Sequence, residues 1–238
     1  MRRHRELKEF LSTPVFYIVA GIFLALSGYK FYSLLMSYID FMNVYPDYLA
    51  GTEVKELAGV SINSYLFPRL FSFYSYLVLI SVPILNSGIG QDRTMELDKL
   101  ELTASGITEL KLILRKVFTS SLVIVVILLP TIIYPLIISV FTTVDYGTVF
   151  SSYLGLLLLI LLSSCIVSPV SVLKIPFAVS IFFNVIMLLI LYMYILEPVF
   201  SPFMFGVIRL CTLLFIVTFA AAFILISKRI YLSTRLFA

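Results

Sequence analysis

The residues of this chain that could do acid–base, nucleophilic or metal chemistry are few and scattered. Its one histidine, His4, lies among arginines, and its two cysteines, Cys165 and Cys211, lie far apart inside apolar runs. Metal sites and catalytic triads need several such side chains brought together. The sequence therefore predicts no metal site and no enzyme active site, and both cysteines are expected to be buried as small hydrophobic residues.

After the first third of the chain, one long charged and polar stretch, residues 87–116, interrupts the apolar sequence. Within residues 94–102, apolar side chains such as Met95 and Leu97 are interleaved with charged ones such as Glu96 and Asp98, a pattern that predicts a short amphipathic helix. Thr108 is placed to cap a second helix that follows. An amphipathic helix of this kind can rest on lipid headgroups or dock in the groove of a partner protein, and the spacing alone favours neither.

Three further polar residues lie within or beside apolar runs. Glu197 and Arg209 are expected to reach the membrane surface, which is favoured over a possible outer gate formed by an ion pair between them. Asn184 is expected to form hydrogen bonds in helix packing and not to bind a substrate. The tyrosines, among them Tyr74 and Tyr192, are expected at membrane interfaces or in packing.

The composition requires that membrane spans position these groups. The 238 residues are 61% hydrophobic and 13% charged, against about a quarter charged in an average soluble domain. Apolar runs of about 20 residues, enough to cross a hydrocarbon core, recur along the chain. The sequence predicts an all-α integral membrane protein, one domain over residues 1–238, with six transmembrane helices at about 15–36, 70–85, 117–141, 149–170, 175–196 and 207–226.

Three features are expected outside or within these spans. An amphipathic surface helix should precede the first span, its contacts made by Arg5, Leu7, Phe10 and Leu11. A cleavable signal peptide is disfavoured, because Glu6 and Glu9 spoil a basic leader. Pro130 and Pro135 predict a kink or break in the third span, and residues 197–206 predict a re-entrant or interfacial pair of short helices between spans five and six.

The basic residues predict the orientation. With the N-terminus inside, thirteen of the seventeen Lys and Arg residues face the cytoplasm. Membrane topology explains the net charge of +4 better than nucleic-acid binding, since the basic residues form no aromatic-interleaved patch. The chain is expected in the cell membrane, inner or plasma, as a multi-pass protein with both termini cytoplasmic and residues 87–116 in the cytoplasm.

Two segments resemble a known family. Residues 101–108, ELTASGIT, followed by Leu114-Arg115-Lys116, resemble the cytoplasmic loop of ABC transporter permeases of the type-2 exporter class (ABC-2 type). Residues 6–14, ELKEFLSTP, resemble that family's surface helix and its turn into the first span. A long first outer loop and residues 82–85, VPIL, are most similar to the gliding-motility permease subfamily. The chain departs from the family pattern at Asp98-Lys99, where Gly-Thr is usual, and at Gly106, where Pro is usual.

The resemblance implies a permease subunit that pairs with a second permease, identical or different, and receives a cytoplasmic ABC ATPase dimer. The surface helix would be a neighbouring ATPase contact. ATP and Mg would bind the partner ATPase, because this chain has no P-loop motif and is expected to bind no cofactor directly. The residues implied in ATPase coupling are Glu96, Leu97, Leu100, Glu101, Leu102, Ile107, Leu110 and Lys116.

The expected function is export driven by ATP hydrolysis on those separate subunits. The alternative is an ABC-type complex acting mechanically or in assembly of surface or gliding machinery, without small-solute transport. A secondary carrier is disfavoured, because the spans lack ionisable coupling residues and no internal repeat is visible.

Overall fold

The computed structural model describes residues 11–49, 62–88, 108–141, 143–172 and 176–236. Nearly all of these residues are helical, and no strand occurs among them. Six helical segments are long and apolar enough to cross a membrane. The predicted all-helical, multi-pass architecture is therefore confirmed at this level.

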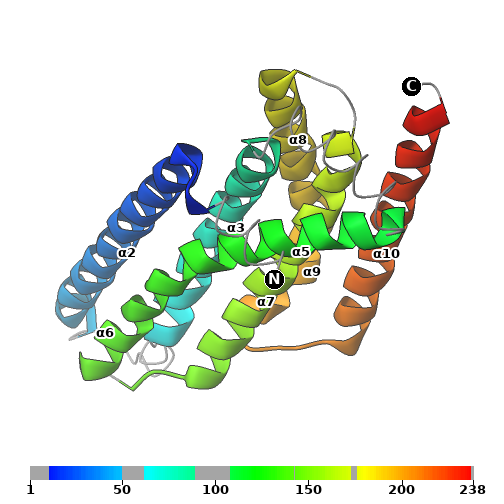
Figure 1. Ribbon diagram of the computed structural model, residues 1–238. Coiled ribbons are helices and arrows are strands. Elements are labelled where there is room, and N and C mark those ends of the chain that lie inside the picture. The colour runs from blue at the N-terminus through cyan, green and yellow to red at the C-terminus, as the bar shows by residue number, and fades with distance from the viewer. Residues whose placement is uncertain (1–10, 50–61, 89–107, 142, 173–175, 237–238) are drawn as a thin grey trace.

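Successive spans run in opposite directions (Figure 1). We call the end where α2 begins and α10 ends the proximal end, at the top of Figure 1, and the opposite end, with the α6–α7 and α9–α10 connections, the distal end. The elements in chain order are α2 (Pro14–Leu49), α3 (Ile62–Gly88), α5 (Glu109–Leu128), the 3₁₀ turn η2 (Leu129–Ile132), α6 (Ile133–Phe141), α7 (Tyr146–Val172), α8 (Phe177–Leu191), the π turn η3 (Tyr192–Leu196), α9 (Glu197–Met204) and α10 (Leu210–Leu236).

The first two helices are longer than the predicted spans. Helix α2 continues to Leu49, although the apolar pattern ends near residue 36, and α3 begins at Ile62 and not near residue 70. Polarity marks where a helix can leave the hydrocarbon, and a helix satisfies its own backbone hydrogen bonds in water as well as in lipid. The end of an apolar run therefore need not be the end of a helix.

The predicted break in the third span is confirmed. Helix α5 ends at Leu128, and the 3₁₀ turn that follows contains Pro130. Proline has no backbone N–H to donate, and its ring crowds the preceding helical turn. At this break the Thr131 hydroxyl donates to the Leu128 carbonyl at 2.7 Å.

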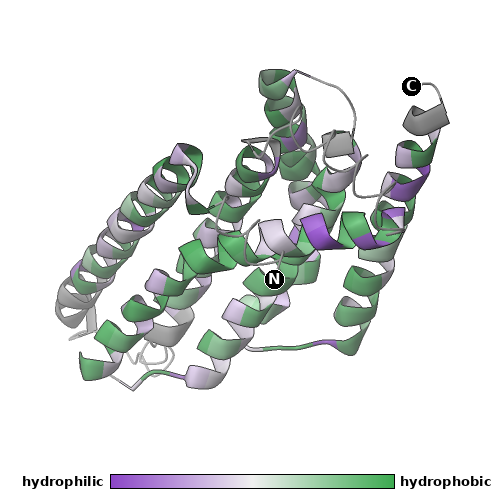
Figure 2. Ribbon diagram, viewed as in Figure 1, coloured by the Kyte–Doolittle hydropathy of each residue, from purple (hydrophilic) through white to green (hydrophobic). Residues whose placement is uncertain are grey.

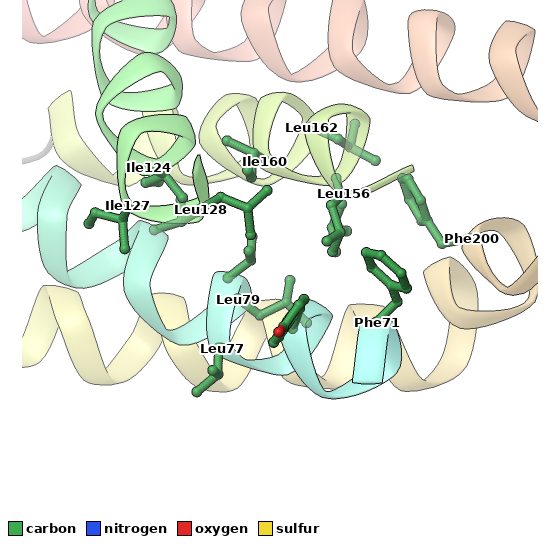
Figure 3. Packing of buried hydrophobic residues seen from close by; sticks show 14 of the residues in the cluster. Phe71, Leu77, Leu79, Ile124, Ile127, Leu128, Leu156, Ile160, Leu162 and Phe200 are labelled. Carbon is green, nitrogen blue, oxygen red and sulfur yellow. The ribbon is translucent and has the colours of Figure 1, made fainter. Parts of the chain in front are cut away.

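Helices α3 and α7 form the centre of the bundle. Within the best apolar window of each span, 67% of residues are buried for α3 and for α7, against 28% for α2 and 22% for α10. Phe71 and Leu79 of α3, Ile124 of α5, Leu156 of α7 and Phe200 of α9 meet in one contiguous core (Figure 3). Because lipid is as apolar as the core, packing and interhelical hydrogen bonds hold such a bundle together.

One such hydrogen bond joins α7 to α10. The hydroxyl oxygens of Ser168 and Ser227 lie 2.6 Å apart, and both residues are buried. We expect Ser168→Ala or Ser227→Ala to lower stability by about 0.6 kcal/mol, the average for interhelical hydrogen bonds in a membrane protein. Thermal unfolding in detergent measures this, with Ser233→Ala, an exposed serine of α10, as the control. If the double variant loses as much stability as the two single variants added together, the two hydroxyls act independently and the hydrogen bond between them contributes nothing.

Asp145 caps the start of α7 in the loop outside the spans. Its side chain accepts hydrogen bonds from the Thr148 hydroxyl and from the Gly147 N–H, the latter at 3.0 Å. These bonds, that from Thr148 first, lower the pKa of Asp145 below its usual range, because they favour the ionised form.

This lowered pKa predicts a pH dependence. A carboxylate with a depressed folded-state pKa stabilises the fold fully above its unfolded pKa of about 3.9, and that contribution is lost as the pH falls through the folded pKa. At pH 7 we expect Asp145→Asn to have a lower melting temperature than the unchanged protein. The difference between the two melting temperatures should become smaller below about pH 4. A gap that stays constant down to pH 3 would show that ionisation of this side chain does not support the cap.

The fifth span is not one regular α-helix. Helix α8 passes through the π turn at Tyr192–Leu196 directly into α9. After α9, Gly206 takes a φ of +83° beside Thr148, a conformation that glycine adopts without strain. The structure thus has one short helix and a turn in the predicted segment 197–206, and its re-entrant character stays a prediction.

Candidate functional site

The described part of the predicted coupling site is the start of α5. Thr108 has an extended backbone and stands at the N-cap, but its side chain makes no capping hydrogen bond, so the predicted cap is wrong in that detail. Its carbonyl accepts from the N–H groups of Lys111 and Leu112 at 3.0 and 3.2 Å, which begins the helix. Leu110 is half-buried and Lys116 is exposed. The other predicted coupling residues lie outside the described ranges: Glu96, Leu97, Leu100, Glu101, Leu102 and Ile107.

Charge gathers at the proximal end around this helix start. Helix α5 packs against α7, α10 and α3. Hydrophilic residues mark the first turns of α5 and the C-terminal part of α10, which carries Lys228 and Arg229 (Figure 2). Helix α5 therefore runs without a break from a polar, basic end of the bundle into its core.

The predicted surface helix is described only at its last residue. Leu11 is half-buried and packs against the hydrophobic core. Arg5, Leu7 and Phe10 lie outside the described part of the chain. The amphipathic surface helix and its ATPase contact stay predictions.

The possible gate residues are both at the distal end. Glu197 begins α9 and Arg209 lies immediately before α10, and both side chains are exposed. No ion pair joins them in this structure. Their exposure fits the favoured interpretation, in which each reaches the membrane surface. An outer gate formed by the two residues stays a prediction.

A polar cluster that sequence reasoning missed lies in the interior beside the break of the third span. We call it the tyrosine cluster: Ser27, Tyr74, Thr131, Tyr134 and Tyr153. The Tyr134 hydroxyl lies 3.3 Å from the Ser27 hydroxyl, and the Tyr153 hydroxyl lies 3.1 Å from that of Thr131. Tyr74 is fully buried close to Tyr134 and Tyr153, and its hydroxyl has no hydrogen-bond partner. The cluster joins α2, α3, the third span and α7 through uncharged hydrogen-bonding groups.

A second missed contact joins α7 to α9. The Ser151 hydroxyl donates to the Phe203 carbonyl at 2.7 Å, and the Ser152 hydroxyl lies 3.3 Å from the same oxygen. Gly155, one turn further along α7, lies directly against the Phe203 side chain. Small residues that recur along one helix face are the usual signal for such a close approach. Here the signal is the sequence Ser151-Ser152 followed by Gly155.

The buried polar side chains of the described ranges are all serine, threonine or asparagine, apart from the tyrosines. Asn184 is buried as expected, but its Nδ2 donates within its own helix, to the Ser180 hydroxyl at 3.4 Å, and its Oδ1 has no partner. Such groups can hydrogen-bond neutral polar atoms and one another. They supply no fixed charge to the interior of the bundle.

The cysteines differ from each other. Cys165 is buried, as expected, but Cys211 is exposed, because it lies in the first turn of α10 on a side that faces away from the bundle. Among the described residues no group of His, Cys, Asp and Glu side chains could hold a metal ion. Comparisons with models of protein families, with curated proteins and with solved structures found no match to this chain.

Proposed function

We propose that this protein is the transmembrane permease subunit of an ATP-binding-cassette export complex. Separate cytoplasmic ATPase subunits would bind ATP and Mg, and residues 96–110 would form the coupling helix that touches them. The proposal rests on the resemblance of residues 6–14 and 101–108 to ABC-2 permeases. A second permease subunit, identical or different, would complete the complex.

The observation that carries the proposal is the placement of α5. The long polar stretch leads directly into this helix, whose first turns carry Glu109, Lys111, Arg115 and Lys116. The same helix then packs against α3, α7 and α10. A rigid helix that continues from a polar loop into the core can pass a displacement of that loop to the spans.

The interior suits a cargo without strong charge. Buried polar groups in the described ranges are uncharged hydroxyls and one amide. A charged cargo near the bilayer centre would meet no fixed countercharge there. Placing a charge at that depth costs at least about 2.5–3.5 kcal/mol. We therefore expect the cargo to be amphipathic or apolar.

The test co-expresses the chain with each ABC ATPase encoded in its source genome. We expect one of these ATPases to co-purify with the chain, with vanadate-sensitive ATP hydrolysis, and the double charge reversal Glu96→Lys, Glu101→Lys to reduce the retained ATPase at least about tenfold, about 1.4 kcal/mol. Asp40→Lys is the matched control, since Asp40 is an exposed carboxylate of α2 toward the distal end. Full retention and full hydrolysis in the double variant would refute the coupling assignment.

A transport assay then separates export from mechanical work. Vesicles reconstituted with the co-purified complex should move an amphipathic fluorescent probe when ATP is added. Hydrolysis that persists without movement of any such probe would favour the mechanical or assembly alternative.

A further inference from the structure

Two cations lie on the seam between α2 and α3. The Lys30 Nζ is 5.8 Å from the centre of the Phe73 ring, and the Arg69 Cζ is 4.0 Å from the centre of the Tyr65 ring. The rings of Tyr65 and Tyr38 are 5.6 Å apart, which ties the same face of α3 to α2 again.

These contacts place both charges on one face. Tyr65, Arg69 and Phe73 are spaced four residues apart, so their side chains follow one another along one side of α3. Lys30 of α2 reaches the Phe73 end of this row, and Tyr38 of α2 reaches the Tyr65 end. The two cations therefore lie along the same seam, and we call them the α2–α3 cation pair.

The pair lies near the depth of a headgroup layer. Lys30 is sixteen residues beyond Pro14, the start of α2, which is about 24 Å along the helix, and Arg69 is nineteen residues before Gly88, the end of α3, about 28 Å. A hydrocarbon core is about 30 Å thick. If the proximal helix ends mark one membrane surface, both cations reach the other surface.

Neither charge has an anionic partner among the described residues. Arg69 is exposed, Lys30 is half-exposed, and no ion pair is formed by either of them in that part of the chain. The described carboxylate next along α2, Asp40, is ten residues beyond Lys30, or about 15 Å. Contact with an aromatic ring orients a cation but leaves its charge unneutralised.

We propose that the α2–α3 cation pair binds the phosphate of an anionic phospholipid in the leaflet at the distal end of the bundle. Phosphate is the anion that this layer supplies at this depth. The arginine can bind two phosphate oxygens through its planar fork, while the lysine adds a second positive charge. The site needs only insertion of the bundle in a membrane, and it does not depend on an ATPase partner or on the direction of insertion.

The test is native mass spectrometry of the purified full chain in detergent, titrated with phosphatidylglycerol and with phosphatidylcholine. We expect tighter binding of phosphatidylglycerol, because it carries net negative charge. The double variant Lys30→Gln, Arg69→Gln should weaken that binding at least about tenfold, or about 1.4 kcal/mol. The charge-preserving variant Lys30→Arg, Arg69→Lys should keep most of it.

The matched control is Lys228→Gln, Arg229→Gln, which removes two basic residues of α10 at the proximal end. Equal weakening in this control, or no weakening in the first double variant, would overturn the proposal. So would displacement of the lipid by free glycerol phosphate at equal concentration, since the site would then recognise a soluble anion. If the first double variant does not elute as a single species, Arg69→Gln alone, at an exposed side chain, decides the outcome by the same criterion.

Discussion

Gly155→Ala is expected to destabilise the protein by about 1–3 kcal/mol, the usual cost of adding atoms to a well-packed core. A Cβ atom at this position would lie 2.7 Å from the Cβ and 3.0 Å from the Cγ of Phe203. Real Cβ atoms do not approach other carbons that closely. Helix α7 or α9 would have to move away from the other.

That movement would break other contacts in the same place. Ser151 and Ser152 direct their hydroxyls at the Phe203 carbonyl, one turn before Gly155 on α7. Phe200 and Phe203 are both buried in the core. The α7–α9 contact is therefore held at a fixed separation from two sides, and relief of the clash at Gly155 stretches the hydrogen bonds.

Gly21→Ala is the matched control. An added Cβ at Gly21 of α2 would meet nothing within 4 Å. There alanine should be neutral or stabilising by up to about 1 kcal/mol, because glycine is unfavourable inside a helix. Melting of fluorescent-protein fusions in detergent, followed by size-exclusion chromatography, measures both variants.

A rescue variant checks the cause. Each change at Phe203 opens a cavity of its own, so the comparison is the cost of Gly155→Ala within each background. Phe203→Ala retains the Cβ that makes the closest contact, so Gly155→Ala should still destabilise there, whereas Phe203→Gly removes that atom and should make Gly155→Ala cost less. If Gly155→Ala and Gly21→Ala have the same melting temperature, the close approach of α7 and α9 is not a constraint on this fold.

Hydropathy predicted where the spans lie but not how they are arranged. Helix α3 contains the least apolar of the six spans and yet is one of the two most buried, whereas the far more apolar α10 is the least buried. In a membrane, lipid-facing positions must be apolar, while interior positions can be polar if their hydrogen bonds are satisfied. A ranking by hydropathy therefore cannot identify the central helices.

Local signals gave mixed results. Pro130 lies in the predicted break of the third span, where proline removes a backbone hydrogen bond and crowds the preceding turn. Pro83 of α3 and Pro169 of α7 nevertheless lie inside continuous helices, so proline alone does not decide where a span breaks. The Ser151–Phe203 contact joins positions 52 residues apart, and the tyrosine cluster draws on four spans. The small residues of α7 mark a face that can pack closely, but spacing along one helix does not show which side chains meet there, since the relative rotation of the helices decides that.

Tyr74→Phe is expected to stabilise the protein by about 1 kcal/mol. The Tyr74 hydroxyl is fully buried and has no hydrogen-bond partner. A buried donor or acceptor without a partner costs about 1–3 kcal/mol, and phenylalanine removes the polar atom while it keeps the ring. The ring contacts with Phe23 and Phe71 stay in place.

Tyr153→Phe, the same change in the same cluster, should have the opposite sign. It removes the hydrogen bond between Tyr153 and Thr131 and should destabilise by about 1 kcal/mol. Tyr32→Phe, at an exposed residue of α2, should leave the melting temperature unchanged. Destabilisation by Tyr74→Phe of the same size as by Tyr153→Phe would show that the Tyr74 hydroxyl finds a hydrogen bond in the membrane. If Tyr74→Phe stabilises the protein and Tyr153→Phe destabilises it, the Tyr74 hydroxyl weakens the core that the Tyr74 ring helps to pack.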